Sequence, residues 1–172
     1  MDDALWLPVH VVWLVSIVMI LLGLVGLYVR YADLMGSVGL AAFLVAFVGT
    51  TLLVAGSFID AFVLPVLALE FPEAFETPPV PLSIALSLTY LLFALGYVLL
   101  GTALLRSGVA ARWAGLMLAV GAPLFAVGVA TVQPLAVLGA VLFGVSWAWQ
   151  GYAIVSGQGV AAQQAQQTAR AR

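Results

Sequence analysis

Residues 26–56 read GLYVRYADLMGSVGLAAFLVAFVGTTLLVAG, and they hold the end of one apolar run and most of the next. A transmembrane helix needs about 20 apolar residues to cross a hydrocarbon core roughly 30 Å thick. The link between the two runs is short and carries Arg30 and Asp33. The stretch therefore predicts two membrane helices joined by a short polar loop.

The composition of the whole chain favours lipid as its solvent. Of 172 residues, 65% are hydrophobic and 7% are charged, and the mean hydropathy is +1.23. Soluble domains are about 45–50% apolar and about 25% charged. A membrane β-barrel alternates apolar and polar residues, whereas the runs here are continuously apolar. Because lipid offers the backbone no hydrogen-bonding partners, we expect an all-α membrane protein.

Five apolar runs are long enough to cross a bilayer. They predict one transmembrane domain over residues 1–157, a five-helix bundle, followed by a polar, low-complexity tail at 158–172. The expected spans are about 5–29, 37–66, 81–105, 112–132 and 134–155.

Arginines mark the cytoplasmic side of a membrane protein. With five crossings, every arginine falls on one side, namely Arg30, Arg106, Arg112, Arg170 and Arg172. Most acidic residues fall on the other side, namely Asp2, Asp3, Glu70, Glu73 and Glu76. We therefore expect a multi-pass protein of the cell membrane, with its N-terminus outside and its C-terminus in the cytoplasm.

Residues 101–128, GTALLRSGVAARWAGLMLAVGAPLFAVG, resemble the opening stretch. Each holds a helix end, an arginine, a short loop and a Gly/Ala-rich helix. Gly49 and Gly56 match Gly121 and Gly128 at a constant offset. The pattern favours a tandem repeat of parallel hairpins, although chance likeness among such helices is an equal alternative.

Small residues at every fourth position let membrane helices approach closely, which drives their association in lipid. Such ridges predict a tight bundle of the last four helices, and serve internal packing better than a dimer seam. The predicted packing residues of the last two helices are Ala136, Ala140, Gly144 and Ala148, with Ala122 and Ala126.

One aspartate interrupts the second apolar run, in residues 50–83, TTLLVAGSFIDAFVLPVLALEFPEAFETPPVPLS. On a structural interpretation, the span ends near Phe58 and a short outer-leaflet helix follows, which Pro65 kinks or restarts and Asp60 caps. On a functional interpretation, Asp60 marks a site, since a carboxylate in lipid is costly unless paired.

Trp6, His10 and Trp13 share one face of the first predicted helix, at i, i+4 and i+7. If the first two helices are neighbours, His10 can pair with Asp60 near the outer surface, above Tyr90 in the third helix. These five residues form the candidate ligand site, suited to a proton relay, a cation or a polar headgroup. The alternative is a solvated histidine at the membrane interface without a ligand role, with the tryptophans in an aromatic belt.

Several kinds of chemistry are excluded or unsupported. The chain has no cysteine and, by its sequence, no lysine, which excludes disulfides, thiol catalysis and Schiff bases. One histidine and a proline-broken group of glutamates do not make a metal site. No catalytic motif is present, and no basic patch suggests nucleic acid. We expect a protein that is not an enzyme and has no metal or cofactor.

The sequence loosely resembles small prokaryotic membrane proteins of four to five helices to which no activity is assigned. The resemblance rests on Arg30, on Gly36, Gly39, Gly49 and Thr50, and on the run from Asp60 to Pro65. It implies a polytopic fold and carries no activity. The tryptophan-rich sensory proteins, also five-helix, are disfavoured because the loop VRYADLMGS lacks their Trp/Pro-rich motifs.

Two functions are consistent with these observations. The first is a non-catalytic accessory, assembly or scaffold subunit of a larger membrane complex, or a homo-oligomer in the bilayer. The alternative is a protein that binds or transports a small molecule, lipid or cation at an outer-face site near His10 and Asp60.

Overall fold

The computed structural model describes residues 5–71, 80–108 and 112–156, and within these ranges it is helical without strands. A long first helix is followed by a π-helical turn, a short helix and three further long helices. Their bounds are α1 Trp6–Phe58, η1 Ile59–Val63, α2 Leu64–Glu70, α3 Val80–Ser107, α4 Arg112–Ala130 and α5 Gln133–Val155.

Helix α1 is two arms joined at Gly36, which we call the first arm (residues 6–35) and the second arm (residues 37–58). Gly36 has φ 60° and ψ −156°, so the helix is broken there. This conformation is essentially limited to glycine, because a Cβ would clash with the backbone. The chain reverses at this single residue.

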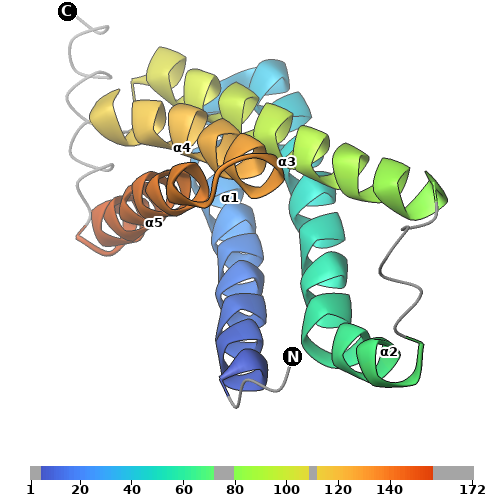
Figure 1. The fold of residues 1–172 in the computed structure, drawn as a ribbon. Helices are drawn as coiled ribbons and strands as arrows, with labels where there is room; N and C mark the ends of the chain where they lie inside the picture. Colours follow the sequence, from blue (N-terminus) through green and yellow to red (C-terminus); the bar gives the residue numbers. More distant parts are fainter. Residues whose placement is uncertain (1–4, 72–79, 109–111, 157–172) are drawn as a thin grey trace, which may run out of the picture.

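The two arms run antiparallel, as Figure 1 shows in blue and teal. Near the turn, the rings of Tyr28 and Phe43 stack with centroids 4.3 Å apart. At the open end, the indole Nε1 of Trp6 lies 3.2 Å from the backbone oxygen of Asp60. Contacts at both ends therefore hold the arms together.

The polar loop predicted between the first two runs is wrong in extent. Residues 30–35 continue the first arm as helix, and the second arm resumes directly after Gly36. Hydropathy marks where the apolar residues end, whereas helical hydrogen bonds continue into polar sequence without loss. Arg30 thus lies on a helix, with its guanidinium 5.5 Å from the ring centroid of Tyr31.

The second arm ends at Phe58, and the chain continues through η1 into α2. Pro65 lies in the first turn of α2, where its missing N–H is not needed. Asp60 does not cap a helix, since the helical backbone runs on through it and leaves no free N–H groups to cap. The cap predicted at Asp60 is therefore wrong.

Helix α3 packs closely on the second arm through two glycines. A Cβ on Gly49 would lie 2.6 Å from the Cα of Phe93, and a Cβ on Gly96 would strike the backbone of Ala46. The fully buried Tyr97 then reaches Thr50, 2.9 Å between hydroxyl oxygens. Because the Thr50 hydroxyl donates to its own helix, Tyr97 is the donor.

Helices α4 and α5 form the second close pair. The backbone at Gly128 abuts that of Ala136, and Ser146 donates to the backbone oxygen of Ala114 at 2.7 Å. Among the predicted packing residues, Ala122, Ala126 and Ala136 are buried, and Ala140 is half-buried. Gly144 and Ala148 are exposed.

The two matching stretches share features in the fold. Each reversal follows a glycine with positive φ, 60° at Gly36 and 67° at Gly108. Gly49 and Gly121 each face the backbone nitrogen of a phenylalanine on a neighbouring helix. Gly56, by contrast, faces open space. A common origin of the hairpins remains a prediction.

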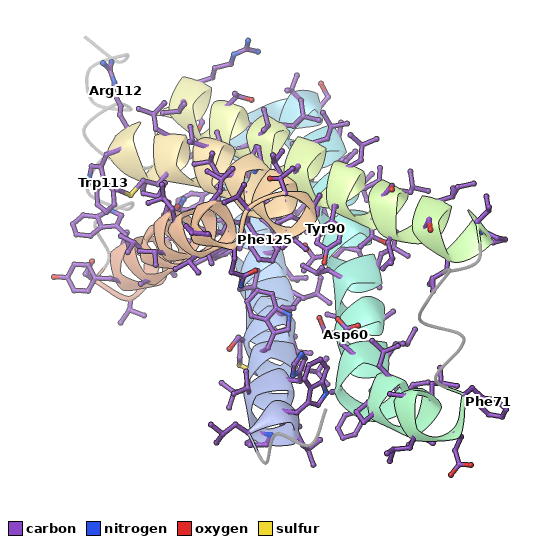
Figure 2. The ribbon with its side chains drawn as sticks, in the orientation of Figure 1. Asp60, Phe71, Tyr90, Arg112, Trp113 and Phe125 are labelled. Carbon is purple, nitrogen blue, oxygen red and sulfur yellow. The ribbon has the colours of Figure 1, made fainter. Side chains whose placement is uncertain are left out.

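Four helices within the described ranges are long and apolar enough to cross a membrane, which agrees with a multi-pass membrane protein. The first of these runs from Trp6 to Glu70 and includes both arms. The N-terminal end and α2 lie at one end of the molecule, at the bottom of Figure 1. Arg112 lies at the other end, and Asp60 lies toward the first (Figure 2).

Candidate functional site

The first arm carries Trp6 and His10 near its open end, and Trp6 reaches the second part of the chain at Asp60. Their side chains stack, with ring centroids 3.9 Å apart and planes 23° apart. The Nδ1 atom of His10 lies 2.8 Å from the backbone oxygen of Trp6. A carbonyl can only accept a hydrogen bond, so the Nδ1 atom of His10 carries the hydrogen. In this neutral form, Nε2 is a hydrogen-bond acceptor.

The backbone oxygen of Asp60 has lost its helical donor. In an α-helix it would accept from the N–H of Leu64, but that N–H bonds Ile59 in the π-turn. The donor in π spacing would be residue 65, which is proline and has no N–H. The indole of Trp6 donates to this oxygen instead. The π-turn and Pro65 together thus create the acceptor that joins the arms.

The side chain of Asp60 points toward the first arm, and Tyr90 of α3 lies farther from the open end of the arms (Figure 2). Asp60 is half-buried and interacts electrostatically with His10 and with Tyr90. Within the described ranges, His10 and Asp60 form no direct ion pair, and the bond between their arms runs through Trp6. The fold therefore brings together three ionisable groups from three helical segments.

Farther from the open end of the arms, the helices form a cavity of about 200 Å³ with several aromatic residues in its lining, which we call the aromatic cavity. Phe125 of α4 connects it to the polar residues, with its ring centroid 5.4 Å from that of Trp13 and 6.3 Å from that of Tyr90. The cavity draws on every long helix. Its lining is Trp13, Ser16, Ile17, Ile20, Leu53, Phe93, Phe125, Ala140, Phe143 and Gly144.

Of the five predicted site residues, Trp13 lies in the cavity wall. Trp6 contacts His10 and Asp60, and Asp60 interacts electrostatically with Tyr90. That these residues bind a ligand stays a prediction. Sequence analysis did not identify Phe93, Phe125 or Phe143 as part of the site. Phenylalanine in an apolar helix is ordinary, and no spacing within one helix shows that three helices converge. Phe125 follows two residues after Pro123, which is the only local signal.

In the described ranges, no group of three histidine, cysteine, aspartate or glutamate side chains is placed to hold a metal ion. Glu70 is exposed at the end of α2. Glu73 and Glu76, like Asp2, Asp3, Arg170, Arg172 and the predicted tail at 158–172, lie outside the described residues.

Replacing Trp6 with phenylalanine should loosen the open end of the arms. The variant keeps a ring but leaves the backbone oxygen of Asp60 without a donor, so we expect the free energy of unfolding to fall by about 1 kcal/mol. Thermal unfolding in detergent would measure it. Trp149→Phe is the matched control, since its indole bonds no described residue; an equal loss there would contradict the assignment.

No protein-family model, curated protein or solved structure matches this chain.

Proposed function

We propose that the chain crosses the membrane five times, each arm of α1 being one crossing. The continuous helical run of 65 residues would extend roughly 100 Å if straight, about three times the thickness of a bilayer core. The reversal at Gly36 divides it into lengths of roughly 45 Å and 51 Å, each long enough for one crossing and too short for two.

The orientation we propose is N-terminus outside and C-terminus in the cytoplasm. Arg30 lies on the last turns before the reversal of α1, Arg106 on the last turn of α3 and Arg112 at the start of α4. With five crossings these positions fall on one side, which positive residues mark as cytoplasmic. The open end of the arms, where Trp6 bonds Asp60, then lies on the outer side of the membrane.

The function that the geometry supports best is binding of a small hydrophobic amine, without catalysis. The observation that carries it is the aromatic cavity, together with the polar residues His10, Asp60 and Tyr90 outside its lining, which we call its polar end. His10 lies one turn from Trp13, and Tyr90 lies one turn from Phe93. His10 stacks on Trp6 near the open end of the arms, and Asp60 lies nearer that end than Tyr90 does (Figure 2).

The chemistry of the lining selects the class of ligand. Aromatic walls accept an apolar body, and their negative faces also attract a cation. Asp60 is half-buried and no described cation pairs it directly, so a bound ammonium group would offset the desolvation of its charged form. A ligand with an apolar body and one cationic head fits both ends of the site.

Equilibrium dialysis of 1-naphthylmethylamine into protein-loaded and empty nanodiscs tests this function. We expect saturable binding that weakens about tenfold in Asp60→Asn, because one charge-assisted contact is lost. The neutral analogue 1-methylnaphthalene should bind the wild type and Asp60→Asn equally.

Filling the cavity supplies the second part of the test. Ala140→Phe places a ring in the lining and should abolish binding of the amine. Leu138→Phe adds a ring on the exposed face of the same helix and should have no effect. Unchanged binding in Ala140→Phe would show that the cavity is not the site.

The accessory-subunit role is a separate proposal, and it rests on a face of α5 that includes Gly144 of the cavity lining. Gly144 and Ala148 leave one side of α5 exposed, and a Cβ on Gly144 would meet nothing within 4 Å. A partner helix could approach closely there. Native mass spectrometry of the assembly from its own membrane separates the functions. A stoichiometric protein partner, kept in His10→Ala and Asp60→Asn, would favour the accessory role.

A further inference from the structure

A second cavity, of about 260 Å³, lies between the first arm and α5, away from the aromatic cavity's polar end. Met19, Ile20 and Gly23 form one wall, and Trp147, Gln150, Gly151 and Ile154 form the other. None of these side chains is ionisable. An otherwise apolar pocket thus contains one indole and one amide.

Both polar groups are buried and lack partners. The Nε1 atom of Trp147 and the Nε2 atom of Gln150 make no hydrogen bond to any described residue, although each atom is shielded from solvent. Gln150 as a whole is only 3% exposed. Leaving a buried donor unsatisfied costs about 1–3 kcal/mol, so two in one pocket call for a ligand that supplies an acceptor.

Packing holds the indole in place. Trp147 meets the ring of Tyr97 at 86° and that of Phe143 at 72°, both edge to face. Gly23 makes room for it, because a Cβ there would lie 3.3 Å from the indole ring. Gly151 leaves the other side open, since a Cβ at that position would meet nothing within 4 Å. The indole ring is therefore fixed in the wall of an unfilled space.

We propose that this pocket binds a neutral carbonyl oxygen carried on an apolar molecule. The indole N–H can only donate, and the pocket holds no charge to balance an anion. A single water could accept from both donors but would leave most of the pocket empty. A carbonyl oxygen can accept from both donors while its apolar body fills the remaining space.

The depth of the pocket agrees with a ligand that enters from the lipid. Gln150 lies five residues before the end of α5, or about 7.5 Å along the helix, and Trp147 lies roughly one turn further in. The ester of a glycerolipid and the ring ketone of a quinone offer the same carbonyl chemistry. The inference does not rest on the proposed amine site.

Indole ¹⁵N–¹H spectra in nanodiscs of ether-linked lipid, which lacks ester carbonyls, provide the test. Trp147→Phe assigns the Trp147 signal among those of the five tryptophans. We expect this signal to shift downfield when an ester phospholipid or decylubiquinone is added, and the other indole signals to remain in place. A shift with the phospholipid identifies a lipid ester, and a shift with the quinone identifies a free carbonyl compound.

Two variants and a control complete the experiment. Gln150→Leu keeps similar bulk and should weaken binding about tenfold, as expected for one lost hydrogen bond. Gly151→Leu should fill the pocket and abolish the shift, whereas Gly26→Leu, which also faces open space, should preserve it. No shift of the Trp147 signal with either probe in the folded wild type would overturn the proposal.

Discussion

Replacing Gly36 with alanine should open the two arms of α1. Its backbone, at φ 60° and ψ −156°, is one that alanine reaches only with a strain on the order of 1–3 kcal/mol. The competing conformation is an ordinary helical turn, which alanine favours. We expect the free energy of unfolding to fall by about this amount and the distance between the open ends of the arms to increase.

The chain is well suited to this measurement because it contains no cysteine. Spin labels on cysteines introduced at the exposed Val9 and Phe62 would report the distance between the arms in nanodiscs. Gly26→Ala is the control, since Gly26 lies in regular helix and faces open space. An unchanged distance and stability in Gly36→Ala would mean that another feature sets the reversal.

Alanine at positions 49 and 56 should change stability in opposite directions. At Gly49 the added Cβ would lie 2.6 Å from the Cα of Phe93, so α3 must move away from the second arm. We expect a loss of about 1–3 kcal/mol from this overpacking. At Gly56, on the same arm, the Cβ meets nothing within 4 Å. There alanine should add about 0.5–1 kcal/mol through helix propensity.

Thermal unfolding of both variants in one detergent would measure the two signs. The pair is informative because both changes add one methyl group to one helix. A loss at Gly49 with no loss at Gly56 would locate the close approach of α3. Equal effects at both positions would contradict the packing of α3 on this glycine.

Composition and hydropathy were sufficient to predict an all-helical fold with several helices long and apolar enough to cross a membrane, which is confirmed for the described residues. Continuous apolar runs leave the backbone no other way to satisfy its hydrogen bonds. The reversal was harder to place, because Gly36 is one of 17 glycines and nothing local distinguishes its positive φ. The loop predicted at Arg30 was wrong, because polar residues let a helix leave the lipid for water without breaking its backbone hydrogen bonds.

The candidate site was partly predictable, since the shared face of Trp6, His10 and Trp13 follows from helical spacing alone. Their approach to Asp60 depends on the two arms being neighbours, which no single helix reveals. The sequence analysis considered a pair between the side chains of His10 and Asp60. The side chain of Asp60 drew attention, whereas its backbone oxygen makes the bond to Trp6. Only the hydrogen-bond register of the π-turn explains that difference.

That register has an evolutionary consequence. A π-turn holds one residue more than an α-turn, so everything after it is rotated by about 100° relative to an uninterrupted helix. Deletion of a single codon within residues 61–63 would therefore switch the phase of α2. It would place Pro65 four residues after Asp60, so the Asp60 oxygen would still lack a helical donor and remain free for Trp6. The face that α2 turns toward the arms could thus change in one genetic step, while the aromatic cavity kept its walls.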